Sequence, residues 1–197
     1  MSATGPLSES LVIALLDRVK NILLTPKSEW PRIAEEAASV QSLYVAYIMI
    51  LAAIGPIAMA IRMGVIGATV ALVGYVVALV VTYLLALIVD ALAPTFGGEK
   101  NFIQSLKLTA YSYTAAWVAG IFQLVPGIGG IIGLLAAIYS FYTFYLGVTV
   151  LKKCPADKAA TFTIVVVLCG IVLGIVLGGL LVSLFLGGTA GLTGLGL

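Results

Sequence analysis

Residues 102–151 decide the fold class, and they read FIQSLKLTAYSYTAAWVAGIFQLVPGIGGIIGLLAAIYSFYTFYLGVTVL. Two apolar segments in this stretch are each long enough to cross the hydrocarbon core of a bilayer, which is roughly 30 Å thick. Only PGIGG (126–130) separates them. The first segment begins with polar residues and the second ends with aromatic ones, so a hairpin places those two ends against the same leaflet. The sequence therefore predicts two membrane helices joined by a tight glycine turn.

The composition of the chain also indicates a membrane protein. Hydrophobic residues make up 62% of the 197 residues, and charged residues make up only 9%. Soluble domains carry roughly 25% charged residues. A soluble fold of this length cannot hide so much apolar surface, so lipid must cover much of the chain.

Apolar stretches of sufficient length recur along the chain and predict five transmembrane helices. The expected fold class is all-α, a polytopic membrane bundle preceded by short amphipathic helices in residues 1–40, on the cytoplasmic side. The membrane domain covers 41–188, and an uncharged, flexible, extracytoplasmic tail is expected at 189–197. The expected spans are about 42–61, 65–89, 102–125, 128–151 and 160–186.

Two helices are expected before the first span. Ser8 can cap a helix that starts at Glu9. Thr25-Pro26 ends that helix, because the residue before a proline avoids the helical region. The apolar face of this helix either lies on the membrane surface or packs on other helices. The side chains of that face recur at helical spacing: Leu11, Val12, Leu15, Leu16, Val19, Ile22 and Leu23.

Local features predict how the helices sit and pack. Trp30, in the second short helix, is interpreted as an interfacial anchor, because indole favours the headgroup region; docking of a protein is the alternative. Gly55-Pro56 interrupts the first span and predicts a kink. Small residues spaced four apart in the fifth segment predict a closely packed helix face, within the bundle or between copies. These residues are Gly170, Gly174 and Gly178.

The distribution of cationic residues predicts the orientation. With five spans and a cytoplasmic N-terminus, only Arg62 falls on the outer side. Cytoplasmic segments of membrane proteins are enriched in Lys and Arg, so we expect the C-terminus outside the cell. The inner side receives Arg18, Lys20, Lys27, Arg32, Lys100, Lys107, Lys152, Lys153 and Lys158.

Polar residues within the hairpin and at the end of the second span predict a candidate pocket that faces the cytoplasm. Ionisable groups near the membrane usually face the bundle and form pairs, so we expect Asp90 to pair with Lys107. The pocket could hold a lipid headgroup, a peptide or water. The alternative is a girdle of interfacial tyrosines, with Lys107 reaching to the surface. The candidate residues are Asp90, Gln104, Lys107, Tyr111, Thr114, Tyr139 and Tyr142.

Residues typical of catalysis are scarce. Histidine is absent, which removes the commonest general base and metal ligand. Cys154 and Cys169 lack the spacing of a metal site. The glycine turn at 127–130 lacks the Lys-Ser or Lys-Thr of a phosphate-binding loop. We therefore expect no enzymatic activity, no metal, no cofactor and no nucleic-acid partner.

Three stretches, in order and at matching spacing, carry a resemblance to a known family: TPKSEWPRI (25–33), AYSYTAAW (110–117) and LVPGIGGIIGLLAAIYSFYTFYLGV (124–148). With the five-span layout, they resemble the prokaryotic branch of the Yip1 domain proteins. Eukaryotic members act in traffic between endoplasmic reticulum and Golgi and contact Rab-type GTPases. Their Asp-Leu-Tyr-Gly-Pro element survives here only as Leu43-Tyr44, so that function is not carried over. The resemblance implies a membrane-shaping or partner-binding protein in a prokaryotic inner (plasma) membrane.

These observations predict a non-catalytic integral membrane protein that binds partners or lipids and organises the membrane. The expected partners are membrane lipids, a protein on the cytoplasmic side, and further copies of the chain. The alternative function is a small channel, transporter or lipid scramblase, formed by the bundle or by an oligomer of it. The apolar outer halves of the spans argue against a continuous polar pathway in a monomer.

Overall fold

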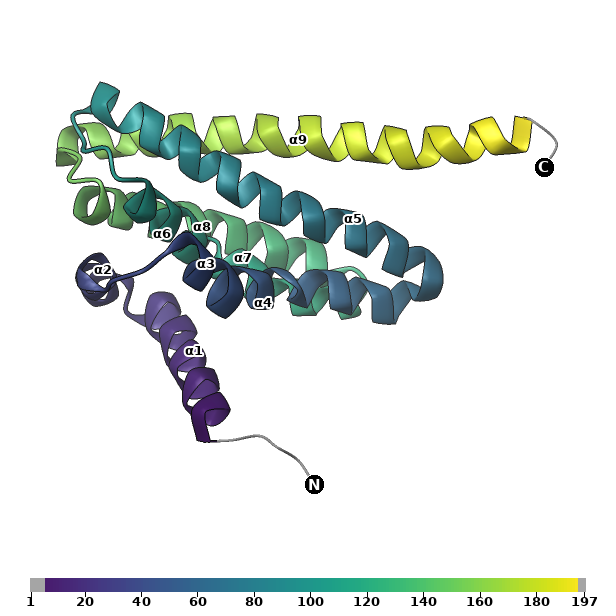
Figure 1. Cartoon of the computed structure of the whole chain (residues 1–197), viewed down its shortest axis with the longest axis horizontal. Helices are drawn as coiled ribbons and strands as arrows, with labels where there is room; N and C mark the ends of the chain where they lie inside the picture. Colours follow the sequence, from purple (N-terminus) through teal and green to yellow (C-terminus); the bar gives the residue numbers. More distant parts are fainter. Residues whose placement is uncertain (1–5, 195–197) are drawn as a thin grey trace.

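The computed structural model describes residues 6–194 of the chain, with side chains for 10–65, 67–181 and 183. Within 6–194 the regular structure is helical, with no strand. Long helices lie roughly along one direction, and the N-terminal helix α1 crosses that direction at one end (Figure 1). The elements are α1 (Pro6–Leu24), α2 (Pro26–Glu35), α3 (Val40–Leu43), the π-helical η1 (Tyr44–Ile48), α4 (Met49–Ala52), α5 (Ile54–Leu92), the 3-10 helix η2 (Ala93–Phe96), α6 (Phe102–Ser112), α7 (Thr114–Ala119), the 3-10 helix η3 (Gly120–Leu124), α8 (Ile128–Leu151) and α9 (Ala156–Gly194).

Four helical stretches of the described chain are long and apolar enough to cross a membrane. They are Val40–Val65, Gly67–Phe96, Ile128–Leu151 and Ala156–Leu181. They establish a multi-pass, all-helical membrane protein whose spans contact lipid. The expected fourth span, 128–151, has the same bounds in α8.

The expected third span, 102–125, is not a continuous α-helix. It is divided into α6, α7 and η3 by breaks at Tyr113 and Gly120. The three pieces still pack along the bundle, α6 and η3 against α5, and all three against α8. A broken helix inside a bundle is tolerated because neighbouring helices cover its backbone. Of the five transmembrane helices that were expected, four are confirmed, and 102–125 is not confirmed as a fifth.

A single glycine reverses the chain between the first two spans. Gly64 has φ 64° and ψ −144°, inside the element that contains both Ile54 and Leu92. Positive φ is readily adopted by glycine, which has no Cβ. Near Gly55-Pro56, where a kink was expected, the α-helix is interrupted at Ala53, three residues before the proline, and a π-helical stretch lies at 44–48. Pro56 cannot donate a backbone hydrogen bond, which loosens the preceding turn.

Glycines bring two helices together at a place that their spacing did not predict. A Cβ on Gly120 would lie 2.7 Å from the Cα of Gly55, so the two backbones cross in direct contact. Small residues permit this close approach in membranes. The expected packing face on α9 is observed only at Gly170, where a Cβ would meet Leu85 at 3.4 Å. A Cβ at Gly174 or Gly178 would meet no described atom within 4 Å, so packing there is not observed within the chain.

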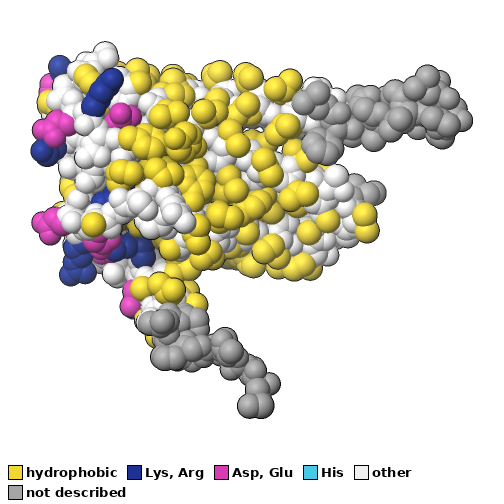
Figure 2. Space-filling model, in the orientation of Figure 1, with side chains coloured by type: hydrophobic (Ala, Val, Ile, Leu, Met, Phe, Trp, Pro, Cys, Tyr) yellow, Lys and Arg dark blue, Asp and Glu magenta, His cyan; other side chains and the backbone are white. Residues whose placement is uncertain are grey.

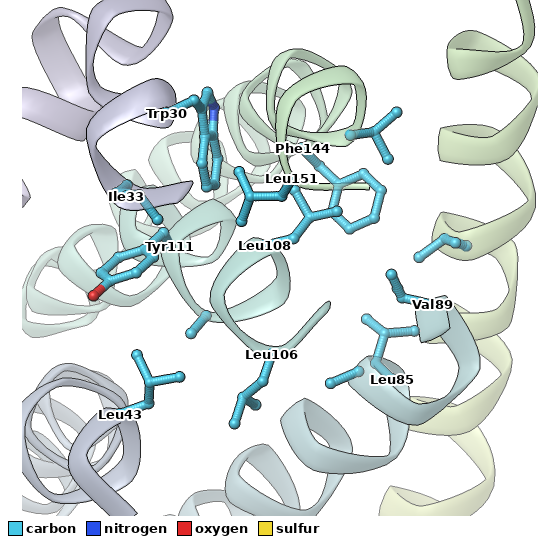
Figure 3. Close-up of a cluster of buried hydrophobic side chains, with 14 of the residues drawn as sticks. Trp30, Ile33, Leu43, Leu85, Val89, Leu106, Leu108, Tyr111, Phe144 and Leu151 are labelled. Carbon is cyan, nitrogen blue, oxygen red and sulfur yellow. The ribbon is translucent and has the colours of Figure 1, made fainter. Parts of the chain in front are cut away.

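The apolar core lies toward the end of the bundle where α2 is found. Side chains from α2, α5, α6 and α8 converge there, among them Ile33, Val89, Leu108 and Phe144 (Figure 3). α9 leaves this core and continues as a helix to Gly194, where a flexible tail was expected from 189 onward (Figure 1). Residues 195–197 lie outside the described chain.

Candidate functional site

Charged side chains gather at one end of the bundle, and this charged end is the candidate site (Figure 2). It is formed by α1 and α2, the connection from η2 to α6, and the connection from α8 to α9. Arg62 belongs to the chain reversal near the opposite end, where its guanidinium donates to the carbonyl of Gln123 at 3.0 Å. Arg62 therefore lies apart from the cationic residues of the charged end, as the sequence predicted.

Arg18 of α1 ties α1 to α2. Its guanidinium forms ion pairs with Glu29 and with Glu36, and its Cζ lies 5.6 Å from the centre of the Tyr111 ring. The Glu29 side chain is buried, so this pair is shielded from solvent on one side. Burial alone would lower the pKa of Arg18, but hydrogen bonding and attraction to Glu36, with smaller contributions from Tyr111 and Glu29, raise it. Arg18 is therefore a fixed charge that holds the two N-terminal helices together.

Two side chains of α6 satisfy the C-terminus of α2. The ammonium of Lys107 donates to the carbonyl of Ile33 at 2.7 Å and to that of Glu36. The amide of Gln104 donates to the carbonyl of Ala34 at 2.9 Å. The last carbonyls of a helix lack partners within it and carry partial negative charge. The spacing of Gln104 and Lys107, one turn apart, lets α6 bind this helix end.

The expected pair of Asp90 with Lys107 is wrong. Asp90 pairs instead with Lys152, whose Nζ lies 2.9 Å from Oδ1 and also donates to the hydroxyl of Ser105 and the carbonyl of Asn101. Lys107 is directed to α2, as described above. Lys152 follows the last residue of α8 and is fully buried. Burial lowers its pKa below the ordinary value, although Asp90 opposes this effect.

Trp30 is an internal residue, which corrects its interpretation as an interfacial anchor. Its side chain is fully buried, and its indole N–H donates to the carbonyl of Thr143 in α8 at 3.1 Å. Gly147, one turn further along α8, makes room for the ring: a Cβ there would lie 2.7 Å from Trp30 Cε2. The amphipathic indole therefore finds its polar partner in a helix backbone instead of a headgroup.

The remaining candidate residues fall into two separate places. Tyr111 packs against the ring of Tyr47 with centroids 4.6 Å apart, and the Tyr47 hydroxyl lies 2.6 Å from that of Thr114. On the other side of the N-terminal helices, Tyr139 donates its hydroxyl to the carbonyl of Leu23 at 2.7 Å. Tyr142 borders the same hollow as Tyr139, together with the turn between α1 and α2.

A cavity of about 230 Å³ lies between α1 and the segment that leads into the first span. Arg18, Glu36 and Lys107 border it, and apolar side chains of both segments complete the wall. The charged groups facing this cavity already have protein partners. No group of three or more Cys, Asp or Glu side chains able to hold a metal ion is found among the described residues. The arrangement joins helices of the charged end through polar contacts.

Sequence reasoning missed the residues that hold the N-terminal helices in place. Arg18 and Lys152 were counted only as cytoplasmic cations, and no role was predicted for Glu29 or Glu36. The only signal for Lys152 was its position directly after an apolar span, which many surface lysines share. Partner choice among these groups depends on which helix ends meet, and helical periodicity does not contain that information.

Comparisons with known proteins place the chain in a family. A search of the curated proteins and a search of the solved structures each found no match. The model of the Yip1 domain matches residues 20–178, which include α2, the membrane bundle and most of α9. The resemblance described from 25–33, 110–117 and 124–148 lies within that range. The chain therefore belongs to the Yip1 domain family.

Proposed function

We propose that this protein is a non-catalytic organiser of the membrane that binds lipid through helix α1 at the charged end. One observation carries the proposal: α1 crosses the direction of the spans at the level where charged and apolar surfaces meet (Figures 1 and 2). A helix in this position lies in the plane of the membrane interface, where amphipathic helices bind.

The two faces of α1 have different surroundings. Ile22 is fully buried, and Leu15, Val19 and Leu23 pack against the core. Other apolar side chains of α1 are turned away from this contact, with Val12 54% exposed and Leu16 61% exposed. Such residues on a helix beside the apolar belt favour insertion among lipid chains. Helix α1, held to α2 by Arg18, would insert into one leaflet only and would change how the lipids of that leaflet pack.

The charge distribution supports a cytoplasmic position for the charged end, in a prokaryotic plasma membrane, with the C-terminus outside. An alkaline phosphatase fused after Leu197 is expected to be active in intact cells, because this enzyme matures outside the cytoplasm. A fluorescent reporter that requires the cytoplasm should fold when fused before Met1. An inactive phosphatase at the C-terminus, with the fusion protein intact in the membrane, would contradict the orientation.

The position of α1 can be measured with spin labels in nanodiscs. On a Cys154→Ala, Cys169→Ala background, labels at Val12→Cys and Leu16→Cys should be accessible to oxygen and protected from an aqueous relaxation agent. Labels at Asp17→Cys and Asn21→Cys, on the polar side of the same helix, serve as matched controls and should show the opposite behaviour. Equal aqueous access at all four positions would remove the basis of the proposal.

The effect on lipid is tested by reconstitution into large vesicles at increasing protein content. The unaltered protein should convert part of the vesicles into narrow or strongly curved ones, visible by electron cryomicroscopy. Val12→Glu with Leu16→Glu should abolish this effect, whereas Asn21→Glu, which places the same residue on the polar side of α1, should retain it. Rapid movement of labelled lipid between leaflets, without any change of shape, would instead favour the scramblase function.

A further inference from the structure

A polar hollow of about 380 Å³ lies at the turn between α1 and α2. Lys27 and Ser28 border it from α2, and Tyr139 and Tyr142 border it from α8. With α1 lying in the membrane interface, as proposed above, this turn reaches the headgroup region (Figure 1). The hollow is therefore placed to receive the polar part of a lipid.

Two hydrogen-bond donors are open to this hollow. The side chain of Lys27 is exposed, and that of Tyr142 is 44% exposed. Among the described residues, neither the ammonium of Lys27 nor the hydroxyl of Tyr142 has a hydrogen-bond or ion-pair partner. The described residues that border the hollow include no Asp or Glu. A cation and a hydroxyl without a neighbouring carboxylate favour an oxyanion as ligand.

An apolar groove of about 420 Å³ adjoins the hollow. Tyr139 borders both, and of two consecutive residues at the end of α1, Leu23 borders the groove and Leu24 the hollow. The hydroxyl of Tyr139 donates to the carbonyl of Leu23 at 2.7 Å, which fixes the end of α1 to α8 at this boundary. A molecule that occupies both the hollow and the groove therefore passes Tyr139.

The groove has the lining of a site for an acyl chain. Its wall on α8 is one helix face that runs from Ile132 to Tyr139, about 10 Å at 1.5 Å per residue. Its other wall is formed by α7 and η3, and the small side chains of Ala119 and Ala136 leave space between the two walls. Leu135, which also borders the groove, is 60% exposed, so the groove is open to lipid.

We propose that the hollow and the groove together bind one anionic phospholipid from the leaflet that contains α1. The phosphate accepts hydrogen bonds from Lys27 and Tyr142, and one acyl chain passes Tyr139 and lies in the groove. A headgroup without a cation, such as phosphoglycerol, fits best, because the hollow offers no carboxylate to an ammonium group. This site rests on the interfacial position proposed for α1, but not on the insertion of its exposed side chains.

Native mass spectrometry of the delipidated full-length protein, released from detergent, measures the Kd of the first lipid bound. Phosphatidylglycerol and phosphatidylcholine with identical acyl chains are titrated separately, and phosphatidylglycerol should bind more tightly. Lys27→Ala should raise the Kd for phosphatidylglycerol about two- to fivefold, as expected for the loss of one exposed ionic contact. Lys100→Ala is the matched control, because Lys100 is exposed but does not border the hollow, and the Kd should not change.

The groove is tested by Ala136→Leu, which fills part of it and should raise the Kd for both lipids, since their acyl chains are the same. Ala68→Leu, at an exposed position of α5, is the matched control and should leave both values unchanged. Melting temperatures in lipid-free detergent check that each variant is folded. If Ala136→Leu does not fold, Lys27→Ala, at an exposed position, still decides the proposal.

Three results would each overturn the proposal: equal Kd values for the two lipids, a Kd for phosphatidylglycerol that Lys27→Ala and Lys100→Ala change alike, or no effect of a folded Ala136→Leu. Because this titration contains no bilayer, it measures binding whether or not α1 deforms a membrane. A failure of this site can therefore be told apart from a failure of the function proposed for α1.

Discussion

The charged end and the distal part of α9 are built from different interactions. At the charged end, Trp30 and Lys152 are fully buried, and polar side chains join α1, α2, α6 and α8. In the membrane-spanning part of α9 only 6% of the apolar window is buried within the chain, compared with 33% for the first span. Ile175 of α9 is 69% exposed. The helices are thus held together by buried polar contacts at the charged end, whereas lipid covers the distal part of α9.

Membrane physics explains this difference. Lipid tails are as apolar as Leu or Ile, so burying such side chains between helices gains little over leaving them in lipid. Close packing and hydrogen bonds then decide where helices associate. Gln104, Lys107, Trp30 and Lys152 supply those bonds at the charged end. The distal part of α9 offers apolar side chains and glycines, and the bundle does not cover it.

The largest loss of stability is expected when the buried ammonium of Lys152 is removed. In Lys152→Met, Asp90 loses its ion pair and Ser105 and Asn101 lose a donor. Breaking a buried pair by removing one partner costs about 3–5 kcal/mol, and we expect a loss of stability near the lower value because Asp90 is 20% exposed. The measurement is the free energy of unfolding by SDS titration in mixed micelles.

The adjacent lysine provides the control. Lys153 pairs with Glu99, but both side chains are largely exposed, at 68% and 63%. Exposed ion pairs contribute roughly 0–1 kcal/mol, so Lys153→Met should leave the unfolding free energy nearly unchanged. If both variants lost the same stability, the charged end would not depend on the buried pair, and the distinction between the two regions would fail.

A smaller change in stability is expected when one glycine in each of the two regions is replaced by alanine. In Gly147→Ala, the new Cβ would lie 2.6 Å from Leu108 Cδ1 and 2.7 Å from Trp30 Cε2. Overpacking costs about 1–3 kcal/mol, offset by up to ~1 kcal/mol from the better helix propensity of alanine. A net loss is expected, measured as a lower melting temperature in detergent.

Gly174→Ala on α9 is the counterpart, because a Cβ at that position meets no described atom within 4 Å. The melting temperature should stay the same or rise slightly. A decrease as large as that of Gly147→Ala would show that Gly174 packs against something outside the described chain, such as a second copy. Cross-linking of the detergent-solubilised protein would then identify that neighbour.

The proposed lipid surface of α1 belongs to the charged end, whereas α9 belongs to the part of the protein that lipid covers. In that proposal, the exposed apolar side chains of α1 insert into the leaflet beside the charged end. A cavity bordered by α5, α8 and α9 lies beside Gly170, where a Cβ would meet Leu85, whereas a Cβ at Gly174, Gly178 or Gly179 would meet no described atom within 4 Å.

Much of the fold follows from local sequence, and the exceptions are instructive. The bounds of α8 were predicted because an apolar run between a glycine turn and Lys152-Lys153 leaves little choice. The break at Tyr113 was missed, since 102–125 is apolar enough to form one helix, and hydropathy does not detect a change of direction. Trp30 was assigned to the surface because indole favours headgroups in general, whereas Gly147 on a distant helix creates its buried site.

The sequence by itself determined the class of protein, the positions of most spans and the gathering of cationic residues at one end. These properties depend on composition and on residues close together in the chain. Only the tertiary structure decided that Asp90 pairs with Lys152, that Lys107 binds the end of α2, and that Trp30 is buried against α8. Each of these contacts joins residues brought together by helix crossings, and the free energy that selects them comes from packing and hydrogen bonds between helices.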